Sequence, residues 1–342
     1  MLWNYLKTAK KPILLYGMGD GAEKILDHLL ALGITPSGVF ASDGFARHNI
    51  FRGYEVISYS EAKEKYKDFI ALICFGSQRP EVLELFQSML PECELYAPDV
   101  PVYGKTIFDR AFAVENSTRL ESVYNSLADD QSRKVFENTV RYKLTGKIQY
   151  LFDCQSTVSE SYESILKPSS GEIYADLGAY TGDTVAEFTS FCKNYKKIIA
   201  VEPDVKSFRK LEKNTSVYEN IKLFNIAVSS DHKYLPFSMD GGRQSVLKES
   251  GKVIECNSVD NILGPDGATI IKFDVEGAEY DAIKGAENTI KTFKPKLCIS
   301  AYHRSEDYFL IPELIKSIRD DYKIYMRHFP YVPAWDTCFY FV

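Results

Sequence analysis

The chain has 342 residues, too many for one ordinary hydrophobic core, and its 45% hydrophobic and 26% charged residues are typical of a globular protein of two domains. The formal net charge of −6 excludes an overall basic surface, so we do not expect nucleic acid or an anionic membrane as the main partner. Because the seven cysteines lie far apart without a Cys-x-x-Cys pair, and because no signal peptide or membrane-spanning run is found, we predict a cytoplasmic protein without disulfides or structural zinc.

Strands and helices alternate through the first hundred residues. The apolar run PILLYG, residues 12–17, predicts a strand, and leucines at helical spacing predict a helix over residues 22–33. Two more strands are expected over residues 37–43 and 69–76, followed by a helix over residues 79–90. This alternation is typical of a parallel sheet with helices on its faces. Prolines near residue 100 mark its end, and we assign residues 1–115 to a Rossmann-like nucleotide-binding domain.

A glycine turn follows the first of these strands. Gly17, Gly19 and Ala22 stand between the strand and its helix, and Asp43 ends the second strand, which is the arrangement of a dinucleotide or sugar-nucleotide fingerprint. Residues 11–100 also resemble, motif by motif, the nucleotide-sugar-binding domain that precedes the hexapeptide repeats of sugar acetyltransferases, although no such repeat follows here. The resemblance implies a second nucleotide site. A purely structural or dimerisation role is the alternative.

Residues 116–168 carry no glycine turn and no strand pattern. Two helical patterns in this segment predict a helical connector or lid. The second helix is expected to begin at Asp129 or Asp130 as the N-cap and to end just before Gly146.

Alternation of strands and helices resumes in residues 169–342. The expected strands lie over residues 172–178, 197–203, 221–229, 269–277, 296–303, 322–328 and 337–342. Because only a loop joins the last two strands, we expect that pair to be antiparallel. The predicted fold class is therefore α/β, with a doubly wound sheet in this segment.

The first strand of this segment ends in a turn, DLGAYTGDT, that places acids beside glycines. Glycines at a strand-to-helix turn let a ligand approach the backbone amides, but the anionic Asp176 and Asp183 would repel a pyrophosphate. They suit a ligand that carries an ammonium and a sulfonium, which describes S-adenosylmethionine. Glu202 closes the next strand, 26 residues after Asp176, where an acid accepts hydrogen bonds from ribose hydroxyls. The turn and Glu202 together predict a nucleoside cofactor.

Two further strand ends carry groups suited to catalysis. Asp274 and Glu276 follow one strand, and His303 follows the next on the same sheet edge, where its ordinary pKa suits the deprotonation of a hydroxyl. A merely solvated or hydrogen-bonded histidine is the alternative, and Asp307 either orients it or starts the following helix. Asp274, Glu276 and Glu279 could together hold magnesium, but their spacing fixes no geometry, and we predict no metal.

Several motifs, in order, carry a resemblance to a known family. From LADDQSRKVFENTVRYKLTG through YADLGAYTGDT, AVEPD, NIAVS, IIKFDVEGAE, AYHRSEDYFLIPELI and the closing WDTCFYFV, residues 117–342 resemble the FkbM-type methyltransferases. The resemblance implies a class I S-adenosylmethionine-dependent methyltransferase sheet of seven strands, the last antiparallel. It also implies that hydroxyls of sugars, polyketides or other natural products are methylated.

The same resemblance implies roles for individual residues. The methionine part of the cofactor would be held by Asp176, Gly178, Ala179, Tyr180, Thr181, Gly182, Asp183 and Thr184. Glu202 would hold the ribose, and Asp204 and Ala227 would lie beside the adenine, with Pro203 included in the site. Asp274 would lie near the transferring methyl group.

We therefore predict an S-adenosylmethionine-dependent O-methyltransferase that acts on a hydroxyl of a sugar, glycan precursor or related natural product. His303 would take the proton, while Asp274 and Glu276 would hold acceptor hydroxyls. Two other classes stay open: an NAD(P)-dependent oxidoreductase or epimerase that uses the first glycine turn, and a non-catalytic nucleotide-binding scaffold. Further expectations are a nucleotide sugar on the first domain and a homodimer. Arg243 and Gln244 lie in a loop that we expect to be solvated, with contact to the substrate as the alternative.

Overall fold

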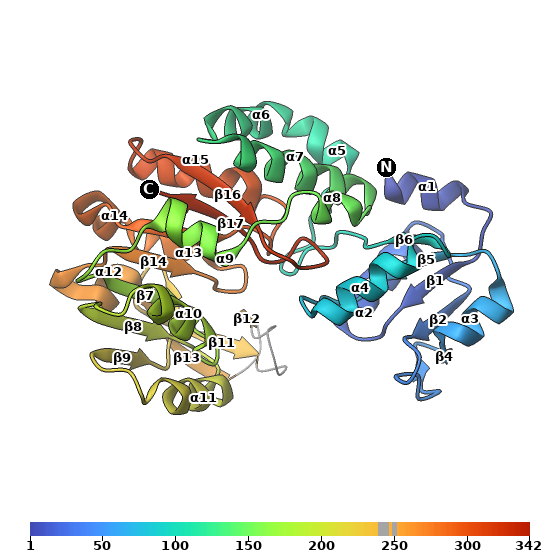
Figure 1. The fold of residues 1–342 in the computed structure, drawn as a ribbon, viewed down its shortest axis with the longest axis horizontal. Coiled ribbons are helices and arrows are strands. Elements are labelled where there is room, and N and C mark those ends of the chain that lie inside the picture. Colours follow the sequence, from blue (N-terminus) through green and yellow to red (C-terminus); the bar gives the residue numbers. More distant parts are fainter. Residues whose placement is uncertain (239–245, 248–251) are drawn as a thin grey trace.

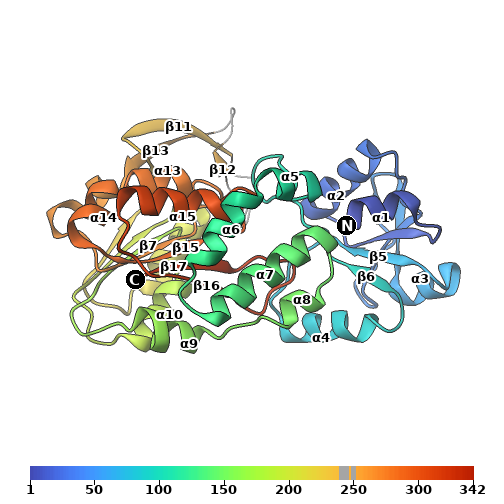
Figure 2. The same cartoon turned by 90° about the horizontal axis from the view of Figure 1, so that it is seen from above.

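The computed structural model describes residues 1–238, 246–247 and 252–342, and it consists of two lobes, each built on a β-sheet (Figure 1). The first lobe holds a six-stranded sheet and the second a seven-stranded sheet with a smaller four-stranded sheet beside it. Helices α5 to α8 lie between the two lobes, as the view from above also shows (Figure 2). Arg243 and Gln244 lie outside the described residues. In the part of the chain that is described, no helix has the length and apolar character needed to cross a bilayer.

The first lobe contains ten elements. They are α1 (Leu2–Thr8), β1 (Ile13–Tyr16), α2 (Asp20–Ala31), β2 (Gly38–Ala41), β3 (Ile50–Phe51), β4 (Tyr54–Ser58), α3 (Tyr59–Tyr66), β5 (Ile70–Ile73), α4 (Pro80–Met89) and β6 (Glu94–Tyr96). The strand order is β3-β4-β2-β1-β5-β6, and every pair is parallel except β3 with β4. The predicted β1, α2, β2, β5 and α4 are confirmed. The sequence analysis missed α1, β4 and α3, and also β3 and β6, which are too short to show a clear period.

A helical segment follows. Its elements are α5 (Arg110–Glu115), α6 (Ser117–Ser126), α7 (Asp130–Thr145), α8 (Gln149–Phe152), α9 (Val158–Glu160) and the π-helical turn η1 (Ser161–Leu166). Asp129 is the N-cap of α7, its carboxylate accepting from the Ser132 amide at 2.7 Å, and Gly146 ends the helix with φ +67°. Both predicted ends are confirmed, because a short polar cap and a left-handed glycine are local signals.

The second lobe contains the remaining elements. They are β7 (Ile173–Leu177), α10 (Asp183–Phe191), β8 (Lys197–Val201), α11 (Val205–Thr215), β9 (Ile221–Phe224), β10 (Ala227–Ser229), β11 (Lys233–Ser238), β12 (Val246–Leu247), β13 (Lys252–Ser258), α12 (Val259–Leu263), η2 (Gly264–Asp266), β14 (Ile270–Phe273), α13 (Glu279–Lys284), α14 (Glu287–Phe293), β15 (Lys296–Ser300), α15 (Asp307–Ile318), β16 (Ile324–His328) and β17 (Thr337–Phe341).

The seven-stranded sheet has the order β16-β17-β15-β14-β7-β8-β9. The five strands from β15 to β9 are parallel, while β17 runs antiparallel to both β15 and β16. This is the predicted mixed α/β sheet with an antiparallel edge, and the fold class is confirmed. The carboxyl ends of the parallel strands lie at one edge, where open α/β sheets bind their ligands.

Helices cover both faces of this sheet. Side chains alternate along each strand, so β7 sends Ala175 and Leu177 to one face and Tyr174 to the other. The first face packs against α12–α15 and against α6 and α7, and the second packs against α10, α11 and η1. Helices α6 and α7 and the turn η1 are thus part of the core of the second lobe, while Tyr142, Ile148 and Leu151 of the same segment pack in the core of the first lobe.

One expected strand is divided. The sequence predicts a single strand over residues 221–229, but the structure ends β9 at Phe224 and places β10 in the four-stranded sheet. The Asn225 side-chain amide donates to the carbonyls of Glu202 and Pro203, at 2.8 and 3.1 Å, and this holds the turn where the chain leaves the large sheet. A period-2 pattern carries no sign of such a change of sheet.

The lobes meet where β5 ends. The amide and carbonyl of Ser77 exchange hydrogen bonds of 2.9 and 3.0 Å with Val332, which lies in the loop between β16 and β17. A Cβ on Gly76 would come within 2.5 Å of the Trp335 ring, so a bare backbone is required at this contact. The first lobe therefore reaches the second at the carboxyl-terminal edge of both sheets.

Candidate active site

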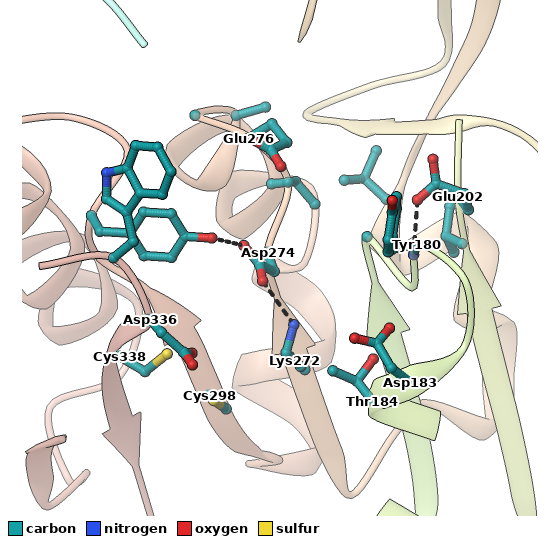
Figure 3. Close-up of a pocket in the computed structure, with 18 of the residues that line it drawn as sticks. Tyr180, Asp183, Thr184, Glu202, Lys272, Asp274, Glu276, Cys298, Asp336 and Cys338 are labelled. Carbon is teal, nitrogen blue, oxygen red and sulfur yellow. Dashed lines mark hydrogen bonds and ion pairs between the residues drawn. The ribbon is translucent and has the colours of Figure 1, made fainter. Parts of the chain in front are cut away.

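A cavity of about 380 Å³ opens at the carboxyl-terminal edge of the seven-stranded sheet, and its volume is in the range of small-molecule sites. Figure 3 shows Tyr180, Asp183, Thr184 and Glu202 on one side of it and Asp274, Glu276 and Asp336 on the other. The loop after β5, the segment around Tyr103 and the loop between β16 and β17 complete its walls. Both lobes thus contribute to one cavity.

The turn after β7 is shaped by the neighbouring strand. Gly178 has φ +91°, and a Cβ on it would lie 1.9 Å from the carbonyl oxygen of Asp274, so only glycine fits here. Tyr180 also adopts a positive φ of 46°, and its amide donates to Glu202 at 2.9 Å. These constraints bring the ends of β7, β8 and β14 together around the cavity.

Glu202 is held by the backbone rather than by another side chain. Its two carboxylate oxygens accept from the amides of Tyr180 and Asp204, at 2.9 and 2.8 Å. Burial raises the pKa of Glu202 to about 7, although these two bonds work against the rise. Each oxygen keeps a lone pair for a further donor, as binding to ribose hydroxyls requires.

Asp176 lies beneath the cavity floor. It has no exposed surface, one oxygen accepts from the Thr184 hydroxyl, and burial raises its pKa to about 6. Lys272, whose side chain lines the cavity, lies near both Asp176 and Asp274, and these carboxylates raise its pKa despite its burial. Asp176 itself does not line the cavity, whereas its neighbours Thr184 and Lys272 do.

The predicted cofactor residues divide into two groups. Those that line the cavity are Gly178, Tyr180, Asp183, Thr184, Glu202, Pro203 and Ala227. Those that lie behind it are Asp176, Ala179, Thr181, Gly182 and Asp204. Asp204 caps α11 by accepting from the Ser207 amide at 2.8 Å, and the carbonyl of Thr181 accepts from Asn214 at 2.8 Å. The second group supports the turn.

Asp274 is the centre of a hydrogen-bonded network on the opposite wall. Its oxygens accept from the Tyr302 hydroxyl at 2.9 Å and from Lys272 at 3.1 Å. Burial would raise its pKa, but Lys272 and His303 hold the value down at about 2. Glu276, which follows with a positive φ of 54°, has a raised pKa because it is buried. The two neighbouring carboxylates therefore differ in basicity.

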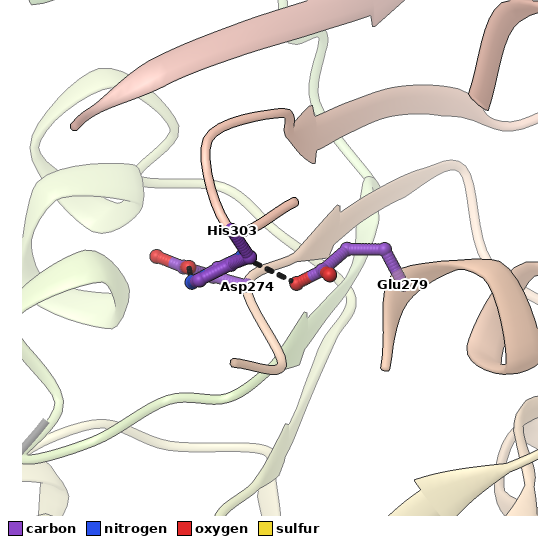
Figure 4. Close-up of side chains that lie close together, drawn as sticks. All are labelled: Asp274, Glu279 and His303. Atoms are coloured by element: carbon purple, nitrogen blue, oxygen red, sulfur yellow. Dashed lines mark ion pairs between the residues drawn. The ribbon is translucent and has the colours of Figure 1, made fainter. Parts of the chain in front are cut away.

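His303 does not line the cavity. It has no exposed surface, and its Nδ1 lies 2.9 Å from Oε1 of Glu279, itself fully buried (Figure 4). Its Nε2 lies 3.5 Å from Glu276 and 3.7 Å from Asp274. Burial lowers the pKa of His303, but Glu279 and Glu276 raise it well above its usual range. The predicted base can therefore reach an acceptor only through these carboxylates. Asp307 opens α15 and accepts from the Arg304 amide at 2.8 Å.

Several lining residues were missed by the sequence analysis: Gln78, Tyr103, Lys272, Tyr302, Arg304, Trp335 and Asp336. For Lys272 there was a signal, since a charged residue inside the apolar strand TIIKF needs a buried partner. The others come from loops or from the first lobe, and their place depends on tertiary packing.

The first glycine turn lies elsewhere. Gly17 and Gly19 have φ of +103° and +135° between β1 and α2, and Ala22 is buried. Asp43 is engaged with Ser60, whose amide and hydroxyl donate to its carboxylate at 2.9 and 2.7 Å, and these bonds lower its pKa. None of Gly17, Gly19, Ala22 and Asp43 lines the cavity.

Comparison with known proteins bears on the second lobe. Residues 176–324 match the model of the methyltransferase FkbM domain. Among solved structures, a methyltransferase FkbM from Methylobacillus flagellatus KT is 25% identical with a TM-score of 0.74, and the match covers 97% of this chain and 90% of that one. Comparison with curated protein sequences gave no match.

Other matches cover about half of the chain. A precorrin-6y C5,15-methyltransferase from Geobacter metallireducens is 12% identical, with a TM-score of 0.34 over 52% of this chain and 81% of that one. A putative rRNA methylase from Clostridium thermocellum is 11% identical, with a TM-score of 0.36 over 54% of this chain and 94% of that one. The resemblance to FkbM-type methyltransferases is confirmed over residues 176–324, where the family model matches. The resemblance of residues 11–100 to sugar acetyltransferase domains stays a prediction.

Proposed function

We propose that the chain is an S-adenosylmethionine-dependent O-methyltransferase that acts on a hydroxyl of a sugar, glycan precursor or related natural product. The observation that carries this proposal is the single cavity, with Glu202 and the β7 turn on one side and paired carboxylates on the other. The match to the methyltransferase FkbM domain supports the transfer of a methyl group.

The cofactor side suits a cationic nucleoside. Glu202 offers two oxygens to ribose hydroxyls, and Pro203 and Ala227 offer apolar surface beside it. Asp183 and Thr184 start α10, where an ammonium would meet a carboxylate and a hydroxyl. A pyrophosphate would meet repulsion from the same carboxylates, which favours S-adenosylmethionine over a dinucleotide.

The opposite wall suits the acceptor. Asp274 and Glu276 would accept hydrogen bonds from its hydroxyls and align one oxygen with the sulfonium methyl, and alignment contributes up to about 7–11 kcal/mol. As the new carbon–oxygen bond forms, the carbon–sulfur bond breaks and its electron pair stays on sulfur. The hydroxyl proton passes to Glu276, whose raised pKa makes it a better base than Asp274.

The acceptor end also has aromatic walls. Tyr103, Tyr302, Tyr331 and Trp335 line it, and such faces suit the apolar surfaces of sugar rings and other natural products. Gln78 from the first lobe lines the same cavity, so the first lobe takes part in acceptor selection under this proposal.

We further propose that Gly17, Gly19 and Ala22 bind a nucleotide sugar, with Asp43 beside it, and that the chain forms a homodimer. Support for the nucleotide site is the pair of positive-φ glycines where β1 meets α2. The oxidoreductase alternative lacks support, because the family match of residues 176–324 is to a methyltransferase domain. Calorimetry with a nucleotide sugar and with NAD, and light scattering, test these points.

The main proposal is tested by titration calorimetry with S-adenosylmethionine on the parent chain and on Asp176→Ala and Glu202→Ala. We expect micromolar binding that both variants lose. Turnover is then followed as S-adenosylhomocysteine release with a panel of free sugars, nucleotide sugars and polyols. Absence of cofactor binding by the parent chain would refute the proposal.

A further inference from the structure

The fully buried imidazole of His303 lies behind the cavity wall, among the carboxylates of Asp274, Glu276 and Glu279. Figure 4 shows it between Asp274 and Glu279. Nδ1 of His303 is paired with Oε1 of Glu279 at 2.9 Å, whereas Nε2 of His303 and Oε2 of Glu279 have no hydrogen-bond partner within the described residues. Buried polar groups in folded proteins are nearly always satisfied. A further partner placed between these two atoms and the cavity would satisfy them.

The distances suit a shared cation. Asp274, Glu279 and His303 each offer one ligand atom within 4.8 Å of the others. Nε2 of His303 lies 3.7 Å from Oδ1 of Asp274 and 3.5 Å from Oε2 of Glu276. Two ligands of one ion, each about 2.1 Å from it, lie about 3.0 Å apart at a right angle and about 4.2 Å apart when opposite. Both observed separations fall between these limits.

The two sides of the ring differ. Oε1 of Glu279, on the Nδ1 side, already accepts from the amides of Val275 and Gly277 at 2.9 and 3.4 Å, so it is fixed in place behind the ring. A carboxylate at this position is the usual outer partner of a metal-bound imidazole, whose orientation it sets. On the Nε2 side, Asp274 and Glu276 line the cavity. The open positions of an ion would face the acceptor.

The carboxylates around His303 also favour the binding of a cation. Asp274, Glu276 and Glu279 bring three negative charges, and Lys272 pairs with Asp274 at 3.1 Å. A divalent ion beside a neutral imidazole would bring the sum of these charges to zero. Glu279 is fully buried and the Asp274 and Glu276 side chains are only 28% and 27% exposed, so a nearby cation would stabilise them.

We propose that Asp274, Glu276 and His303 bind one divalent first-row transition ion, with Glu279 as the outer partner of the imidazole. An imidazole among the ligands favours manganese, iron or zinc over magnesium, which prefers oxygen ligands only. The use of the ion, to bind the acceptor oxygen and hold it in line with the methyl group, rests on the proposed function. The binding of the ion does not.

The full chain is treated with a chelator and titrated with Mn²⁺, Zn²⁺ and Mg²⁺ by calorimetry. We expect one Mn²⁺ or Zn²⁺ per chain, at least tenfold tighter than Mg²⁺. Glu276→Gln and His303→Gln should each weaken binding of Mn²⁺ by more than tenfold, and Glu279→Gln by about 10–100-fold. Asp281→Asn, which alters another carboxylate that lines the cavity, should leave it unchanged.

A second measurement needs no variant. Spin-echo spectroscopy of Mn²⁺ bound to the parent chain should show coupling to one directly bound ¹⁴N nucleus. No binding at millimolar Mn²⁺ or Zn²⁺, no ¹⁴N coupling, or equal affinity in His303→Gln would overturn the proposal. S-adenosylmethionine is titrated on the same metal-free chain. Cofactor binding without ion binding would refute the metal site but not the proposed function. Ion binding without cofactor binding would refute the proposed function but not the metal site.

Discussion

Oε1 of Glu279 lies 2.9 Å from Nδ1 of His303, and neither side chain has any exposed surface. The same oxygen accepts from the amides of Val275 and Gly277, so one buried carboxylate joins the strand end that carries Asp274 to the loop that carries His303. The cavity wall that carries Asp274 is therefore held from behind by a contact that is out of reach of solvent.

Glu279→Gln should destabilise the metal-free chain by about 3 kcal/mol, because breaking a buried pair leaves an uncompensated charge. Urea unfolding in the presence of chelator measures the loss. Glu287→Gln is the control, since Glu287 pairs with Lys291 on the surface of α14 with both side chains about half exposed, and it should cost less than about 1 kcal/mol. Equal losses in the two variants would contradict the role given to Glu279.

Gly178→Ala should cost far more stability than Gly171→Ala. Both glycines have a positive φ, of +91° and +84°, so alanine is strained at each by about 1–2 kcal/mol. Only at Gly178 would the new Cβ meet backbone, 1.9 Å from the carbonyl oxygen of Asp274, while nothing lies within 4 Å at Gly171. We expect a small drop in the urea midpoint for Gly171→Ala, and a much larger drop together with lost cofactor binding for Gly178→Ala. Similar midpoints in the two variants would show that the turn can move.

Affinity for S-adenosylmethionine should rise with pH between 6 and 8. Burial raises the pKa of Glu202 to about 7, so the carboxyl is mostly protonated at pH 6 and mostly ionised at pH 8. If the ribose hydroxyls donate to the ionised form, the dissociation constant should fall about tenfold over this range. Calorimetry on the parent chain and on Glu202→Gln, whose profile should be flatter, checks the assignment; a parent profile independent of pH would refute it.

Trp335 should report ligand binding by its fluorescence. The chain has two tryptophans, and Trp335 lines the cavity while Trp3 belongs to the core of the first lobe. Trp3→Phe should keep the change in emission on adding cofactor or acceptor, and Trp335→Phe should lose it. A signal that follows Trp3 would place ligand binding in the first lobe.

Arg327→Met should destabilise the second lobe by about 3–5 kcal/mol. The Arg327 side chain is only 2% exposed, and its Nη2 lies 2.7 Å from both Asp129 and Glu160, so it ties α7 and α9 to β16. Arg141→Met is the control, because Arg141 pairs with Glu137 on the surface of α7 and should cost less than about 1 kcal/mol. Thermal unfolding of both variants compares them, and a loss in Arg327→Met as small as in the control would contradict the buried network.

The sequence by itself determined the seven strands of the large sheet, apart from the division after Phe224, and it placed Glu202, Asp274 and Glu276 at one edge. These predictions succeed because period-2 patterns, glycine turns and helix caps are local signals, and the carboxyl ends of parallel strands meet at one edge. The FkbM motifs in the sequence also predicted the methyltransferase domain.

Only the tertiary structure decided which way side chains point and what lies behind them. His303 follows its strand as predicted, yet packing turns it away from the cavity toward Glu279, and Asp176 lies under the floor. Gln78 and Trp335 line the same cavity because Ser77 pairs with Val332, two residues that are far apart in the sequence. Local patterns cannot encode such choices, because they depend on the burial of charge and on close packing between distant segments.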